Sequence, residues 1–108
     1  MVDNSHYWVD DSDSQYYNRF VSINNVKSDW SSAEHIIDYG NVYNYCLALD
    51  YNVECVSGKG SAIFLHCSNG VATAGCVAIP EKHMIEVLKN INGNCVIIID
   101  SPDKIKNY

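Results

Sequence analysis

Basic residues are scarce in this sequence, which has 7 Lys and Arg against 13 Asp and Glu and a formal net charge of -6 over 108 residues. The few basic side chains are scattered along the chain and form no stripe. Because neutralising phosphates requires a positive face, this composition argues against nucleic acid as a partner. The length suits one small domain with a single core, so we treat residues 1–108 as one unit carrying one site.

Long apolar runs are also missing. The longest, Cys95–Ile99, is far too short to cross a bilayer, which takes about 20 residues. The N-terminal residues 1–4 show neither the basic region nor the apolar stretch of a secretory signal peptide. We therefore expect no membrane insertion, and nothing in the chain itself predicts export.

Cysteine is abundant, but the spacing of a zinc ribbon is absent. The five cysteines lie at positions 46, 55, 67, 76 and 95, and no CxxC pair occurs among them. Their odd number leaves at least one thiol unpaired, and Cys46, Cys67 and Cys95 lie in apolar runs where cysteine often acts as a small hydrophobe. We expect free thiols, with a disulfide framework as the less favoured alternative.

The first forty residues are polar and aromatic. Asp and Ser favour turns, while the Trp and Tyr rings supply apolar area that a disordered tail lacks, so we expect a structured loop that packs on the core. Asp10, Asp11 and Asp13 imitate the start of a calcium loop, but no glycine and closing glutamate follow in register. We expect no metal and no cofactor. Ser31 and Glu34 have capping-box spacing, which predicts a short helix there.

Strand signals dominate the rest of the chain. Strand formers over Val42–Tyr51 predict one strand, and the continuous apolar run Ala62–Leu65 predicts a second that is buried on both faces and ends at His66. The apolar run Val96–Ile99 predicts a last buried strand. The pattern as a whole indicates a mainly β fold with one or two short helices.

One helix is indicated after Ile79. Pro80 at a first helical position and the early acid Glu81 fit a helix start. Apolar residues follow at helical spacing, namely Met84, Ile85, Leu88 and Ile91. Because glycine commonly stops a helix, we expect this helix to end near Asn92-Gly93.

His66 and Cys76 are the residues on which chemistry is most readily built. A thiol nucleophile needs a nearby base or positive charge, and His66 ends a buried strand only ten residues before Cys76. Gly75 lets the backbone approach closely, so amides near residues 74–76 could face a developing oxyanion. Taken alone this spacing is weak, because histidine at a strand end and cysteine in an apolar turn are also common structural residues.

Two blocks of sequence add a resemblance. GSAIFLH at 60–66 followed by TAGCVAIP at 73–80 resembles the active-site signature of the L,D-transpeptidase catalytic domain, the YkuD-like family, in its branch that has Thr-Ala-Gly-Cys. Trp8-Val9-Asp10-Asp11 and Tyr17-Asn18 resemble the cleft-side elements of the same family, so the similarity runs from about Trp8 to Ile99. The family implies a largely β, β-sandwich-like fold. Its domains usually have further strands before the Trp-Asp-Asp element, which implies that residues 1–108 are the C-terminal part of such a domain.

The resemblance also assigns catalytic roles. It implies that Cys76 is the nucleophile, that His66 is its general base, and that the backbone carbonyl of Cys67 orients the imidazole as the third group of a triad. Two positions depart from the family's pattern. Ala74 replaces a second histidine of the best-known members, and Ala78 replaces an arginine or asparagine. These departures affect substrate handling more than the nucleophilic step.

The substrate side of the resemblance involves a groove. The residues that would line it are Trp8, Asp10, Asp11, Tyr17, Thr73 and Ala74. An aromatic and acidic loop is also common as plain surface structure, so the motif leaves both interpretations open for the first four.

The family's activity is acyl transfer on peptidoglycan stem peptides. The Cys76 thiolate would attack the carbonyl that joins the L-centre of a diamino acid to a terminal D-amino acid, and the acyl-enzyme would pass to an amine or to water. The family acts outside the membrane, which implies an extracellular or cell-wall location. A non-catalytic wall-peptide-binding module on the same fold is the main alternative. A small redox or metal-binding protein that uses His66, Cys67 and Cys76 is a weaker one.

Overall fold

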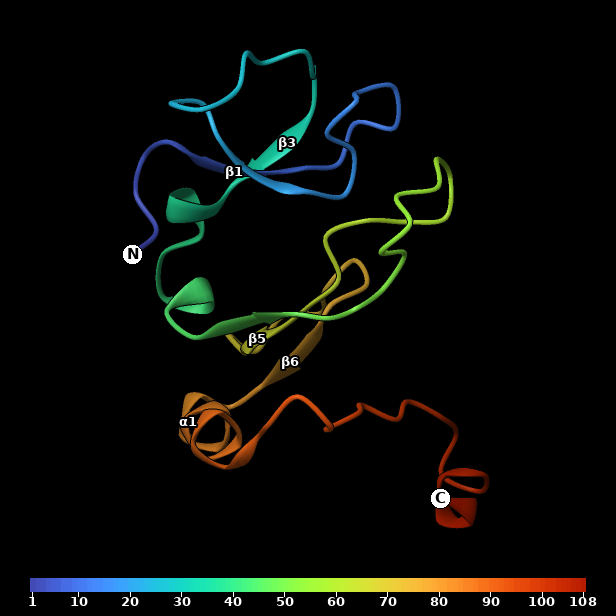
Figure 1. The fold of residues 1–108 in the computed structure, drawn as a ribbon. Helices are drawn as coiled ribbons and strands as arrows, with labels where there is room; N and C mark the ends of the chain where they lie inside the picture. Colours follow the sequence, from blue (N-terminus) through green and yellow to red (C-terminus); the bar gives the residue numbers. More distant parts are fainter.

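The computed structural model describes all 108 residues, and it stacks them in layers (Figure 1). Sheet A has the strand order β2-β1-β3 and sheet B has the order β4-β5-β6. Sheet A contains β1 (His6–Val9), β2 (Phe20–Ser22) and β3 (Ala33–His35). Sheet B contains β4 (Cys46–Ala48), β5 (Phe64–Cys67) and β6 (Val77–Ile79). The helices are η1 (Ile36–Tyr43), α1 (Glu81–Asn90) and η2 (Ile105–Asn107). The fold is therefore mixed α/β with substantial strand content.

Sheet A forms from the polar and aromatic N-terminal segment. β1 pairs antiparallel with both β2 and β3, so Trp8 lies opposite Phe20 on one side and Glu34 on the other. The prediction of a loop was wrong, because strands this short leave too little alternation to stand out between Asp and Ser turns. The helix predicted from Ser31 was also wrong. Ser31 and Ser32 lie in a loop, the next three residues form β3, and the 3-10 helix η1 follows.

Sheet B is antiparallel between β4 and β5 and parallel between β5 and β6. Of the strand predicted over Val42–Tyr51, only Cys46–Ala48 forms, because Val42 and Tyr43 end η1. The predicted buried strand exists, and all four residues of β5 are buried. It begins at Phe64 rather than at Ala62, because Ala62 has a φ of 55° and cannot belong to a strand.

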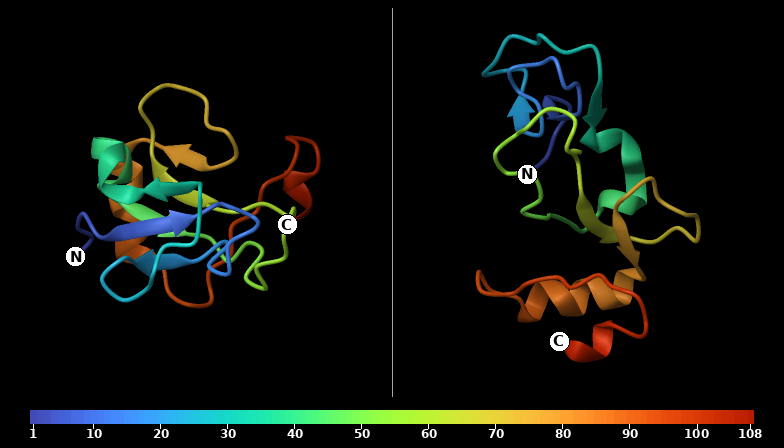
Figure 2. Two further views of the ribbon diagram at one scale, coloured as in Figure 1. Left: turned by 90° about the horizontal axis from the view of Figure 1, so that it is seen from above. Right: turned by 90° about the vertical axis from the view of Figure 1, so that its right-hand side faces the viewer.

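The helix predicted after Ile79 is confirmed as α1, which lies against the face of sheet B that points away from sheet A (Figure 2). Met84 has 0% exposure and packs with Leu65 and Cys67 in the core cluster. Burying such a side chain stabilises the fold by about 1.5–3 kcal/mol. The helix ends at Asn90, before the predicted stop at Asn92-Gly93, since Ile91 is already extended.

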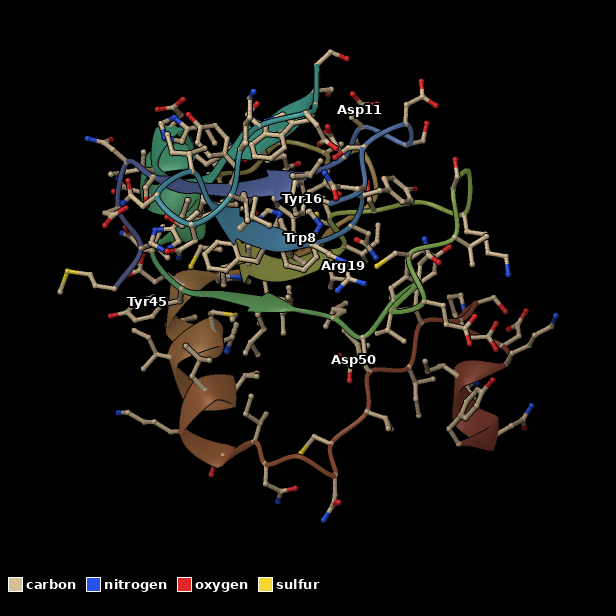
Figure 3. The ribbon with its side chains drawn as sticks, turned by 45° about the horizontal axis from the view of Figure 1, so that its top comes forward. Trp8, Asp11, Tyr16, Arg19, Tyr45 and Asp50 are labelled. Atoms are coloured by element: carbon tan, nitrogen blue, oxygen red, sulfur yellow. The ribbon has the colours of Figure 1, made fainter.

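An aromatic layer joins sheet A to sheet B. The ring of Trp8 meets the ring of Phe64 edge-on at 5.0 Å, and Tyr43 meets Phe64 in the same way at 5.5 Å. Figure 3 shows Trp8 directed from β1 toward sheet B. Edge-to-face geometry suits aromatic quadrupoles and adds to the area that these rings bury. The N-terminal segment therefore packs on the core through its rings, as predicted.

The C-terminal segment differs from its prediction. Val96–Ile99 was expected to be a buried strand, but it pairs with neither sheet, and Val96 and Ile99 are 82% and 71% exposed. After α1 the chain runs as an irregular segment as far as the short 3-10 helix η2 near its end (Figure 1). An apolar run encodes the tendency to be buried but not the presence of a free strand edge beside it. No helix combines the length and apolar character needed to cross a membrane.

Candidate active site

His66 is held in one orientation by the strand that carries it. It lies in the middle of sheet B, is 6% exposed, and its Nδ1 is 2.9 Å from the backbone oxygen of Cys67. A carbonyl oxygen only accepts hydrogen bonds, so in the neutral imidazole Nδ1 carries the proton and Nε2 has the free lone pair. This is the orienting bond that the resemblance implied for Cys67.

The basic nitrogen of His66 keeps access to its surroundings. Nε2 has no hydrogen-bond partner, and no fully buried side-chain N or O atom in the protein lacks one. Nε2 is therefore at least partly accessible. The ring of Tyr43 packs edge-on against the imidazole at 5.3 Å and covers one side of it. The arrangement suits a group that accepts a proton from one direction.

Cys76 lies immediately before β6, on the same face of sheet B as His66. β6 pairs in parallel with β5, and His66 lies opposite Ala78. Extending this register by one pleat places Cys76 beside Phe64, diagonal to His66 on the face that meets sheet A. The thiol does not hydrogen-bond the imidazole. Its Sγ donates to the Ala62 carbonyl at 3.2 Å and accepts the Phe64 N–H at 3.4 Å.

A cavity of about 220 Å³ opens beside the Cys76 thiol. Residues 61–63 and 74–76 form two of its walls, and the carboxylates Asp10 and Glu34 come from the sheet A side. His66 is not among the lining residues. The cavity thus lies between the turn that carries Cys76 and an acidic wall, and four separate stretches of the chain contribute to its lining.

The electrostatics of the cavity favour a neutral thiol. Burial raises the pKa of Cys76 above its ordinary value, and the carboxylate of Glu34 adds to this, while the Phe64 N–H opposes it. Burial also raises the pKa of Glu34, with a contribution from Asp10, although the Tyr43 hydroxyl donates to Glu34 at 2.9 Å and opposes the rise. Because the thiolate is disfavoured at rest, nucleophilic chemistry at Cys76 needs a base.

No protein-family model, curated protein or solved structure matches this chain.

Trp8 is half-buried and Tyr17 is buried, and neither lines the cavity. The Trp8 ring packs on Phe64, and its Nε1–H donates to the Asn18 side chain at 3.1 Å. Tyr17 is buried, with 6% exposure. Trp8 therefore acts first as a packing residue that holds the N-terminal segment on sheet B.

Asp10 and Asp11 differ in position despite being neighbours. Asp10 lines the cavity, and its carboxylate accepts the Ser32 hydroxyl at 2.6 Å. Asp11 points outward in the loop (Figure 3), where it accepts the backbone N–H and the hydroxyl of Ser31 at 2.8 and 2.9 Å. Those bonds lower the pKa of Asp11. Of the four N-terminal groove residues, the structure brings only Asp10 to Cys76.

The turn before β6 is closed by Thr73. Its hydroxyl donates to the backbone oxygen of Cys76 at 2.6 Å, which fixes the turn rather than contacting the cavity. Ala74 and Gly75 both line the cavity. A Cβ added at Gly75 would lie 3.6 Å from Ile63, an ordinary contact, so the room beside this glycine does not itself require the residue.

The Cys67 side chain points away from the site. Its sulfur is buried with Leu65 and Met84 on the opposite face of sheet B, so only its backbone oxygen meets His66. All five cysteines are free thiols. No group of three or more His, Cys, Asp or Glu side chains is placed to hold a metal ion.

Sequence reasoning missed two side chains of this site. Glu34 was interpreted as part of a capping box, and Tyr43 as a strand residue. Their positions follow from the pairing of β3 with β1 and from η1, both of which bring them against the face that carries His66. No local pattern signals this approach.

Proposed function

We propose that this chain is a cysteine-dependent L,D-transpeptidase of the YkuD-like family that acts on peptidoglycan stem peptides. The observation that carries the proposal is the bond from His66 Nδ1 to the Cys67 carbonyl, at 2.9 Å. It leaves Nε2 as the proton acceptor on the face of sheet B that also carries Cys76. The family resemblance of residues 60–66 and 73–80 implies the same arrangement.

The reaction begins when a stem peptide enters the cavity beside Cys76. The thiol turns from the Ala62 carbonyl, gives its proton to His66 Nε2, and attacks the carbonyl that precedes the terminal D-amino acid. The C–N bond breaks, the imidazolium protonates the leaving amine, and an acyl-enzyme remains on Sγ. An amine of a second stem, or water, then gives a proton to His66 and attacks the acyl carbon; the C–S bond breaks, and the imidazolium returns the proton to the Cys76 thiolate. Backbone amides near Gly75 would stabilise the oxyanion.

The acidic wall suits the proposed substrate. A diamino acid in a stem peptide carries an ammonium group, and the carboxylates of Asp10 and Glu34 at the cavity complement a positive charge. The proposal includes an extracellular or cell-wall location. It also includes the finer fold, in which sheets A and B belong to a β-sandwich-like catalytic domain and residues 1–108 form its C-terminal part.

A wall-peptide-binding module without catalysis is the second candidate. The observation that favours it is the resting state of Cys76, whose thiol bonds the Ala62 carbonyl rather than the imidazole. A cavity with a protonated thiol and an acidic wall can bind a cationic peptide without reacting. The two candidates differ in whether a covalent adduct forms.

Intact-mass analysis tests the proposal. The chain is incubated with a stem tetrapeptide, and the expected adduct has the mass of the acyl group that remains after the terminal D-amino acid has left. Cys76→Ser should abolish the adduct, whereas Cys95→Ser, which changes an exposed thiol, should retain it. Absence of an adduct at every pH tried, together with retained peptide binding, would favour the binding module.

A further inference from the structure

Asn18 is a buried side chain whose every hydrogen-bonding group has a partner. Its Oδ1 accepts the indole N–H of Trp8 at 3.1 Å and the backbone N–H of Ala62 at 3.2 Å. Its Nδ2 donates to the backbone oxygens of Tyr51 at 3.0 Å and Asn52 at 2.7 Å. Because the first two partners can only donate and the last two can only accept, the amide has one allowed orientation. Asn18 therefore ties sheet A to the segment that leads into β5.

Ala62 has an unusual backbone conformation at the end of this link. Its φ is 55°, in the left-handed region that an L-residue with a Cβ rarely adopts, and it is buried. Such a residue persists only where its surroundings over-determine it. Its N–H is held by Asn18, and its carbonyl accepts the Cys76 thiol at 3.2 Å.

We propose that Asn18 is a positioning residue that sets the orientation of the Cys76 thiol by holding Ala62 in the left-handed conformation. The chain of contacts is continuous, because the Asn18 amide fixes the Ala62 N–H, the fixed φ directs the Ala62 carbonyl, and that carbonyl receives the S–H. Without the Asn18 acceptor, Ala62 relaxes toward the extended region and its carbonyl turns away from the sulfur. The thiol then loses the acceptor that favours its protonated form.

The inference rests on Cys76 being the reacting group of the proposed function, but its test needs only thiol alkylation. Iodoacetamide labelling is followed by peptide mass mapping over a range of pH, with the exposed Cys95 as a reference in the same molecule. Asn18→Ala should shift the labelling midpoint of Cys76 to lower pH and raise its rate near pH 7 by about two- to tenfold, the range of one hydrogen bond. The midpoint of Cys95 should not move. Asn24→Ala, at an exposed asparagine, serves as the matched control.

A second substitution distinguishes a positioning role of Asn18 from a general loosening of the fold. Glycine adopts the left-handed conformation at no steric cost, so Asn18→Ala with Ala62→Gly should return the Cys76 midpoint at least halfway to its original value. General loosening of the fold predicts the opposite, because glycine adds backbone freedom. If Asn18→Ala does not fold, Ala62→Val provides the test, since a β-branched residue disfavours this φ and should produce the same shift with Asn18 intact.

An unchanged Cys76 midpoint in a folded Asn18→Ala or Ala62→Val protein, or a shift that glycine does not reverse, would overturn the inference. Its failure is distinct from failure of the proposed function. If the stem-peptide adduct forms but Asn18→Ala leaves the Cys76 labelling midpoint unchanged, only the role of Asn18 is refuted. If the midpoint shifts and glycine restores it but no stem-peptide adduct forms, only the proposed transpeptidase activity is refuted.

Discussion

Replacing His66 tests whether the imidazole is the base for Cys76. The expected magnitude follows from the thiol's environment. An ordinary cysteine is only a few per cent thiolate at pH 7, and burial beside Glu34 raises the pKa of Cys76 further, so the unassisted thiolate fraction is smaller still. A positioned general base contributes about 10²–10⁴-fold. We therefore expect His66→Gln and His66→Ala to slow acylation of Cys76 by at least about 10²-fold near pH 7.

Stopped-time intact-mass measurement of acylation by the stem tetrapeptide provides the assay, because a covalent adduct on Cys76 is counted directly. His66→Gln is the preferred variant, since it keeps a polar side chain in a buried position. His83→Ala, at an exposed histidine on α1, is the matched control and should acylate at the original rate. Raising the pH should recover part of the lost rate by forming thiolate without a base. A folded His66→Gln protein that acylates at the original rate would refute the reasoning.

Four further outcomes are expected. Met84→Ala should lower the free energy of unfolding by about 2–5 kcal/mol and Met84→Leu by less than about 1.5, measured by denaturant unfolding, because Met84 is fully enclosed. Cys67→Ala should keep adduct formation, since only the backbone oxygen of Cys67 meets His66, with a stability loss of about 1 kcal/mol in the same assay. Glu34→Gln should lower the pKa of Cys76 and speed its alkylation at neutral pH, because the carboxylate raises that pKa. Bonds to the Asn4 carbonyl and to Asp38 raise the pKa of His35, so its stabilising effect should be full below about pH 6.5 and fade as pH rises through the raised value. Unfolding at several pH values should show this dependence, and His35→Ala should remove it.

Local pattern was sufficient where a segment's own residues decide its structure. Pro80, Glu81 and the apolar spacing that includes Met84 predicted α1 because helical hydrogen bonds and periodicity lie within one segment. The run before His66 predicted a buried strand, since only a strand enclosed on both faces is apolar throughout. Val96–Ile99 shows the limit of the same rule, because a strand also needs a partner edge.

The sequence alone also singled out His66 and Cys76, through a motif and the chemistry that a thiol requires. Only the tertiary structure decided that both lie on one face of sheet B, because this depends on the parallel register of β6 with β5. The acidic wall of the cavity and the hydrogen bond from the Ala62 N–H to Asn18 both depend on sheet A packing over sheet B. Both are contacts between residues far apart in the chain. Sequence periodicity indicates on which face of its own helix or strand a residue lies. A site depends in addition on how different helices and strands pack against one another.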